Sequence, residues 1–133
     1  AREKRLARAF MDLMLDEKPA VVATLHESWK RFHPEIDVSF GQTLIYGETP
    51  MPEIVPWVVE RMNQHLEHPY EKWAPHYYPI DTASSEVISA QTGCIGLCIE
   101  TWMGFEEDRR VAMQRQVVEF LLQHIGIRDR GDA

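Results

Sequence analysis

Three prolines within residues 65–80, at positions 69, 75 and 79, constrain this chain more than any other feature. A proline lacks a backbone N–H and has a fixed φ, so these positions exclude a regular helix and a central β-strand. The same segment holds Trp73 and three of the four tyrosines. Because large aromatic side chains are normally buried or in contact with a partner, we expect an ordered, irregular segment that either covers the core or forms a site.

This aromatic segment is the predicted binding site. Flat apolar walls with a few hydroxyl and imidazole groups are typical of ligand pockets, and large aromatic side chains anchor many protein interfaces. Simple covering of the hydrophobic core is the alternative role. The candidate residues for binding a ligand or partner are Tyr70, Trp73, His76, Tyr77 and Tyr78.

Histidines in and beside the segment are candidate metal ligands. His65 and His68 are three residues apart, so their rings share one face of a helix, and His76 follows them. Their spacing matches no standard zinc motif. We therefore predict no metal and no cofactor, and His65, His68 and His76 are the residues to test if a metal does bind.

Length and charge limit the class of protein. The chain has 133 residues, of which 44% are hydrophobic, and a net charge of −7. This predicts one domain over residues 1–133, with residues 1–3 and 128–133 frayed. Four of the first eight residues are basic, so the rest is strongly acidic and should repel nucleic acid. No apolar run is long enough to cross a membrane, and no signal-peptide pattern is present.

The two cysteines and the serines give no catalytic motif. Cys94 and Cys98 are four residues apart, too far on a strand for a disulfide, so we expect buried, reduced thiols and a cytoplasmic protein. The serines form no nucleophile-elbow pattern. We therefore predict no catalytic residues.

Hydrophobic periodicity predicts helices at both ends of the chain. Helices are expected over residues 3–16, 19–32, 53–68 and 106–125, and strands over residues 36–40 and 43–46. Residues 85–102 have two interpretations. We favour a hairpin turning on Thr92 and Gly93, because Ile, Val and Cys favour strands and each glycine weakens a helix.

The predicted fold is α+β, with a small antiparallel sheet packed by amphipathic helices at both ends of the chain. The alternative is an all-α fold with residues 84–103 as a buried helix. The element order resembles, at the level of fold only, that of bacterial secretion chaperones and toxin-neutralising proteins. The chain carries no motif that identifies a family.

The predicted function is that of a small acidic, non-catalytic binding or regulatory protein. It would act through a protein partner or through self-association as a homodimer, with no nucleic acid and no membrane involved. The alternative is a domain that binds a small apolar or aromatic molecule, or a small enzyme, with an aromatic and histidine pocket in residues 65–80.

Overall fold

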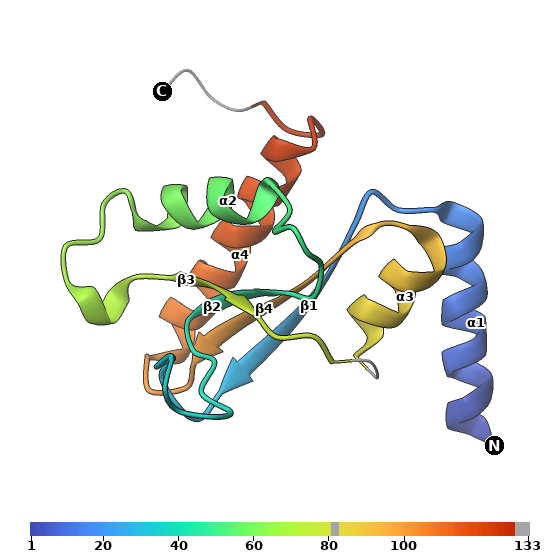
Figure 1. Ribbon diagram of the computed structural model, residues 1–133, viewed down its shortest axis with the longest axis horizontal. Coiled ribbons are helices and arrows are strands. Elements are labelled where there is room, and N and C mark those ends of the chain that lie inside the picture. Colours follow the sequence, from blue (N-terminus) through green and yellow to red (C-terminus); the bar gives the residue numbers. More distant parts are fainter. Residues whose placement is uncertain (81–82, 130–133) are drawn as a thin grey trace.

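The computed structural model describes residues 1–80 and 83–129, and its centre is a four-stranded sheet in the order β1-β4-β2-β3 (Figure 1). The predicted α+β class is confirmed. The strands are β1 (Val21–Ser28), β2 (Thr43–Tyr46), β3 (Ala74–Tyr77) and β4 (Ile95–Trp102). The α-helices are α1 (Arg2–Glu17), α2 (Ile54–Asn63), α3 (Ser84–Thr92) and α4 (Glu107–His124), and a short 3₁₀ helix, η1, covers Pro69–Glu71.

The sheet is mixed, and this corrects the predicted antiparallel sheet. Strand β4 pairs in parallel with β1 and antiparallel with β2, and β2 pairs in parallel with β3. Parallel neighbours require long connections that cross over the sheet. Here the connection from β1 to β4 runs through most of the domain, so β4 enters last and lies between two strands formed earlier in the chain.

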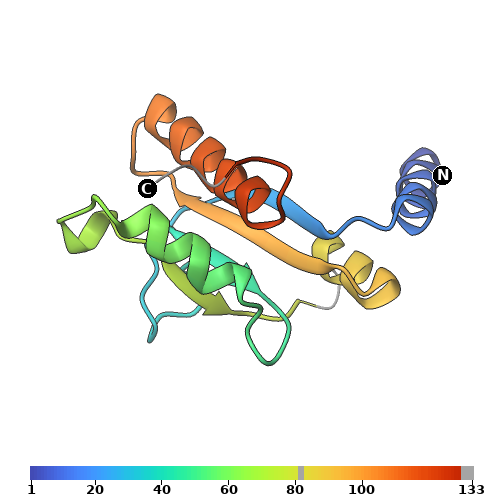
Figure 2. The same ribbon diagram turned by 90° about the horizontal axis from the view of Figure 1, so that it is seen from above.

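One face of the sheet carries the hydrophobic core. Side chains alternate between the two faces of a strand, and on β4 Leu97 and Ile99 point to this face and are fully buried. Helices α2 and α4 cover it (Figures 1 and 2). Their buried residues follow the predicted helical spacing: Ile54, Val55, Val58 and Val59 on α2, and Val117 and Leu121 on α4.

The opposite face is covered in part by α3. Its first turn approaches β4 at Gly96, where a Cβ atom would lie 2.4 Å from the Ser85 carbonyl oxygen. Only glycine permits this approach. Helix α1 packs against α3 beyond the end of the sheet (Figure 2), and none of its residues is buried. The helix predicted over residues 3–16 is confirmed, but its apolar residues are largely exposed, with Leu6 at 72%.

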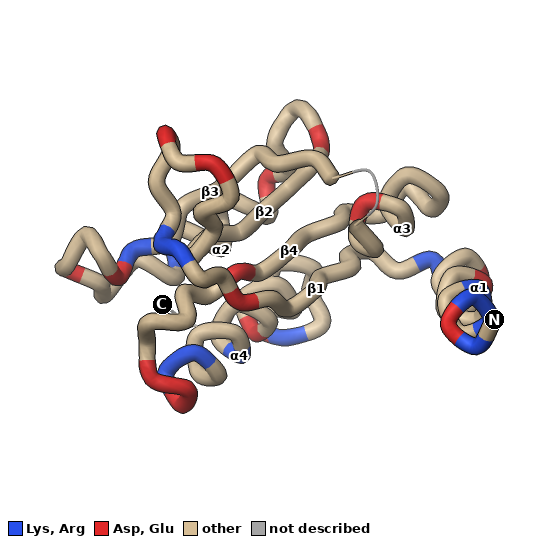
Figure 3. Tube along the Cα trace, turned by 90° about the horizontal axis from the view of Figure 1, so that it is seen from below, with Lys and Arg blue, Asp and Glu red and all other residues tan. Residues whose placement is uncertain are grey.

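Two ion pairs connect α4 to other parts of the domain. Figure 3 shows Lys and Arg spread over several elements, including α1 and α4. Arg110 pairs with Glu27 of β1 at 2.5 Å, and Arg109 pairs with Glu71 at 2.8 Å. None of the described helices is long and apolar enough to span a membrane.

The helix predicted over residues 19–32 is wrong, because residues 21–28 form strand β1. Val21, Val22 and Leu25 fit a helical stripe and a strand equally well. The β-branched side chains favour the strand, and pairing with all eight residues of β4 stabilises it. Strand β1 lies at one edge of the described sheet, where Leu25 remains 58% exposed.

The hairpin predicted over residues 85–102 is half right. Residues 95–102 form a strand, but residues 84–92 form helix α3, which ends at Gly93 in a left-handed conformation with φ of 75°. Thr92 Oγ1 accepts a hydrogen bond from the Cys94 N–H and donates one to the Ile88 carbonyl. Gly93 is therefore a helix C-cap and not the turn of a hairpin.

Two further segments differ from the prediction. Residues 36–40 form an irregular loop instead of a strand, since Val38 has a φ of 51° and the Ser39 hydroxyl bonds the backbone of His33 and Ile36. Within the proline-rich segment, residues 74–77 form strand β3. It is an edge strand, the position in a sheet where a proline such as Pro75 is tolerated.

Gly96→Ala tests the close contact between α3 and the sheet. The added methyl group would overlap the Ser85 carbonyl, so we expect α3 to shift and the free energy of unfolding to fall by about 1–3 kcal/mol. Urea unfolding of the two proteins gives this difference. An unchanged midpoint would show that α3 does not rest on β4 as described.

Candidate functional site

The register between β1 and β4 places two chemically active side chains next to each other. His26 of β1 is the direct partner of Glu100 of β4. Partners in a parallel pair point to the same face, so both side chains lie on the face opposite the hydrophobic core. Cys98, two residues before Glu100, also points to this face.

These side chains line a cavity of about 200 Å³ between the sheet and α3. Strands β1, β4 and β2 supply its floor. Residues from the loop before β2, from the segment after β3 and from the first turn of α3 supply its walls. The lining residues include Thr24, His26, Phe40, Ile45, Tyr78, Ile80, Ser84, Ser85, Glu86, Cys98 and Glu100.

Glu100 is the most unusual of these residues. It is only 8% exposed, and its Oε2 atom has no hydrogen-bond partner among the described residues. Burial raises the pKa of this carboxyl group, while the nearby His26 opposes the rise. A buried, incompletely bonded carboxylate costs stability, so a position like this one is typical of a functional site.

Cys98 lies against the same carboxylate. Its Sγ atom is 3.6 Å from Glu100 Oε1. Burial raises the pKa of Cys98 to about 12, with the negative Glu100 adding to the rise, so the free thiol is protonated at neutral pH. A protonated thiol is a poor nucleophile. The arrangement therefore does not support Cys98 as a nucleophile.

The imidazole of His26, the thiol of Cys98 and the carboxylate of Glu100 converge on one region of the cavity. One ligand atom from each of His26, Cys98 and Glu100 lies within 4.8 Å of the other two. No other set of three such residues converges in this way within residues 1–80 and 83–129. The arrangement suits general base chemistry at Glu100 or the coordination of a cation.

Helix α4 supports the site from the core side. The amide Nε2 of Gln114 donates hydrogen bonds to the carbonyl of His26 at 2.9 Å and to the carbonyl of Ile99 at 3.2 Å. These two residues belong to the two strands that carry the site. Gln114 therefore links the backbone of β1 at His26 to the backbone of β4 at Ile99 and stabilises their relative position.

The predicted aromatic site is dispersed in the structure. Of its five residues, Tyr78 alone lines the cavity. Trp73 is 4% exposed and exchanges two backbone hydrogen bonds with the Asn63 side chain, as expected of a core residue. Tyr77 packs against Tyr46 on the opposite face, and Tyr70 is largely exposed. A binding role for these residues stays a prediction.

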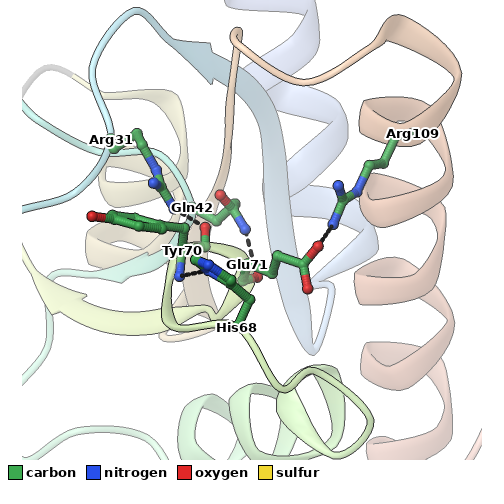
Figure 4. Close-up of polar contacts among 6 residues, drawn as sticks. All are labelled: Arg31, Gln42, His68, Tyr70, Glu71 and Arg109. Carbon is green, nitrogen blue, oxygen red and sulfur yellow. Dashed lines mark hydrogen bonds and ion pairs between the residues drawn. The ribbon is translucent and has the colours of Figure 1, made fainter.

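Polar contacts fix the start of the aromatic segment (Figure 4). The Arg31 guanidinium donates to the Tyr70 carbonyl and lies 4.1 Å from the Tyr70 ring centre. Gln42 Nε2 donates to the Glu71 carbonyl at 2.7 Å, and Arg109 pairs with the Glu71 side chain. The segment is therefore an ordered connection, as its prolines predict.

The three predicted metal candidates do not meet. His68 accepts a hydrogen bond from the Tyr70 N–H and stacks on the Tyr70 ring, and His65 is exposed. His76 packs between Phe32 and Tyr78, and burial lowers its pKa. The convergent donors lie elsewhere, at His26, Cys98 and Glu100.

Sequence reasoning missed His26 and Glu100 and treated Cys98 only as a buried thiol. His26 fell within a predicted helix, and Glu100 within a strand whose partner was misassigned. The available signal was a single charged residue inside the otherwise uncharged run Ile95–Trp102. Burying a charged side chain costs free energy, so a charged residue in a buried strand indicates a pairing or a functional role.

Comparison with known proteins shows which fold this is. No protein-family profile and no curated protein sequence matches the chain. Among solved structures, the product-bound form of the cell shape determinant protein Csd4 from Helicobacter pylori matches with a TM-score of 0.79 and 18% identity, over 91% of this chain and 34% of that one. The tripeptide-bound form matches over the same shares with a TM-score of 0.76 and 18% identity.

A third match carries a description of activity. The mDAP-bound form of Helicobacter pylori Csd4, described as a D,L-carboxypeptidase, matches with a TM-score of 0.67 and 18% identity over the same shares of the two chains. At this identity the likeness shows the fold, and our chain spans about a third of the length of those chains. The prediction of a non-catalytic binding or regulatory protein is wrong, since the chain has the fold of part of an enzyme.

Glu100→Gln tests whether the buried carboxylate is held at a cost to stability. Because the pKa of Glu100 is raised on folding, the group favours the folded state below the ordinary glutamate pKa, and this contribution is lost as pH rises through the folded value. In metal-free buffer, the variant should therefore gain stability over the parent at about pH 8 and lose that advantage near pH 4. Thermal melts at both pH values measure the difference.

Glu60→Gln is the matched control, because Glu60 is an exposed residue of α2, on the core side of the sheet. It should show no such change with pH. Equal stability of the Glu100→Gln variant and the parent at both pH values would contradict the assignment of Glu100.

Proposed function

We propose that this chain is part of a peptide hydrolase that binds a short peptide in the cavity between α3 and the sheet and uses Glu100 as its general base. The single observation that carries the proposal is the buried Glu100 carboxylate, with one unpartnered oxygen, in a cavity beside His26. The fold shared with a D,L-carboxypeptidase supports this class of reaction.

The chemistry follows from the properties of Glu100. A base with a raised pKa takes a proton at neutral pH more readily than an ordinary carboxylate. Glu100 would remove a proton from a water molecule while the water oxygen attacks the scissile carbonyl carbon. The same carboxyl group would then pass the proton to the departing amine nitrogen as the C–N bond breaks. The products are a carboxylic acid and an amine, and Glu100 returns to its starting form.

His26 would assist from the neighbouring strand. A positive charge on its ring favours the ionised form of Glu100, which keeps the base available. The ring is exposed on the cavity side, where it can also donate a hydrogen bond to the developing oxyanion. His26 would thus act on the carbonyl oxygen, while Glu100 acts on the attacking water and on the departing nitrogen.

The dimensions of the cavity suggest the class of substrate. A volume of about 200 Å³ is below the usual range of about 300–1,000 Å³ for drug-sized ligands. It suits one or two amino-acid residues at the end of a peptide. The solved structures with this fold are described as bound to product, to a tripeptide and to mDAP. We therefore propose a short peptide of mixed D and L residues containing meso-diaminopimelate as the substrate.

Hydrolysis by the protein that carries this chain tests the proposal. The parent should release the C-terminal residue from a short mixed D,L peptide with meso-diaminopimelate, and an all-L peptide of the same length should be a poorer substrate. Glu100→Gln should lower kcat by about 10²–10⁴-fold, as expected for loss of a general base. KM should change little, because the amide keeps the shape of the side chain.

Two controls separate chemistry from folding. Glu60→Gln should retain full activity, and a melting curve of Glu100→Gln should show a folded protein. His26→Ala should lower kcat as well. Full activity in a folded Glu100→Gln variant would overturn the role of Glu100 as general base.

A further inference from the structure

We propose that a second cavity, between the loop that follows β1 and helix η1, binds an N-acylated amino acid through its carboxylate and its amide group. This cavity has a volume of about 450 Å³ and lies where β2 and β3 begin. It shares no lining residue with the cavity under α3. Its walls include Arg31, Phe32, Gln42, Tyr70, Lys72 and Trp73.

The charge of the second cavity favours an anion. The charged side chains that line it, Arg31 and Lys72, are both basic, although the chain as a whole has a net charge of −7. Neither forms an ion pair with a carboxylate of the described residues. The acidic residue of η1, Glu71, is paired with Arg109 instead. Both cations therefore remain available to a negatively charged ligand.

Arg31 is held in position before any ligand binds. Its guanidinium donates a hydrogen bond to the Tyr70 carbonyl (Figure 4). It also lies 4.1 Å from the centre of the Tyr70 ring and 5.0 Å from that of Trp102. A guanidinium has five N–H donors, so further donors are left for a carboxylate. Because the group is already ordered, less conformational entropy is lost on binding.

Two buried polar groups of the second cavity have no partner. Gln42 is 3% exposed, and its Nε2 donates to the Glu71 carbonyl, which leaves Oε1 as an unsatisfied acceptor among the described residues. Trp73 is 4% exposed, and its Nε1 donor is unsatisfied too. Buried polar groups are normally hydrogen-bonded. The other two such atoms in the described part of the chain belong to Glu100 and Gln114, in and beside the candidate site.

These groups define the class of ligand. A carboxylate would pair with Arg31 and Lys72, an amide N–H would donate to Gln42 Oε1, and an amide oxygen would accept from Trp73 Nε1. An N-acylated amino acid carries all three groups within a few bonds, as does the last residue of a peptide. The volume lies within the range of about 300–1,000 Å³ that is usual for small-molecule sites. Binding here involves no residue of the proposed reaction, so this site goes beyond the proposed function.

A nuclear magnetic resonance titration of the full protein with N-acetyl-L-leucine tests the site. The chain has four tryptophans, and loss of one indole N–H signal in Trp73→Phe assigns that of Trp73. This signal should shift and saturate as the ligand is added. The described lining of the cavity under α3 contains no tryptophan, so a Trp73 shift reports on the second cavity.

Two analogues of the ligand test the two recognised groups without changing the protein. The ester analogue, in which oxygen replaces the amide N–H, should bind about 2–10-fold more weakly, because Gln42 Oε1 stays unpartnered. N-acetyl-L-leucinamide lacks the carboxylate and should bind about tenfold more weakly or worse. Equal binding of the ester analogue would overturn the proposed class of ligand.

Variants of the basic residues test the protein side. Arg31→Gln should weaken binding by about tenfold or more, as expected for a bond to a charged group. Lys72→Gln should weaken it by about two- to fivefold, since Lys72 is exposed. Lys30→Gln is the matched control, because Lys30 is an exposed neighbour outside the cavity lining, and it should bind like the parent. Melting curves identify variants that fail to fold, and Lys72→Gln serves if Arg31→Gln is one of them.

The results distinguish this site from the proposed function. No saturable shift of the Trp73 signal in the folded parent, or an unchanged affinity in the folded Arg31 and Lys72 variants, overturns the site. Glu100→Gln should bind N-acetyl-L-leucine like the parent. Binding that depends on Arg31, in a protein that cleaves no peptide, supports the site and overturns the proposed function. Peptide cleavage without such binding has the reverse meaning.

Discussion

Strand β4 is the constraint on which the rest of the structure depends. It is the strand that pairs with both β1 and β2, and its Leu97, Ile99 and Thr101 are fully buried. The core cluster of α2 and α4 packs against it on one face. Helix α3 and the cavity lie against it on the other. Without β4, β1 would lose its only partner among the described strands.

The two faces of β4 carry opposite chemistry within eight residues. One face is apolar and closely packed, and this packing stabilises the fold. The other face presents Cys98 and Glu100, and burial of the Glu100 carboxylate opposes stability. The rigid core thus supports a site that is costly by itself, as expected where a protein positions groups for chemistry.

Local sequence patterns were enough to predict part of this fold. Helices α2 and α4 were predicted because their apolar residues repeat at helical spacing and tertiary packing agrees with that pattern. Strand β1 was missed because Val21, Val22 and Leu25 fit both periodicities, and its pairing with the distant β4 decided between them. The site was missed for the same reason, since His26 and Glu100 become neighbours only through that pairing.

The alternation of side chains on β4 has a consequence for how such a protein can change. Inserting or deleting one residue within β4 would exchange its faces, placing Glu100 in the apolar core and Ile99 in the cavity. Core and site would fail together, so a change of length in this strand affects both faces, whereas a single substitution affects one. The loops before β2 and after β3, which reach the cavity through Phe40 and Tyr78, carry no such coupling. Under the proposed function, variation in substrate preference among related proteins should therefore arise by changes in those loops, around a strand of constant length.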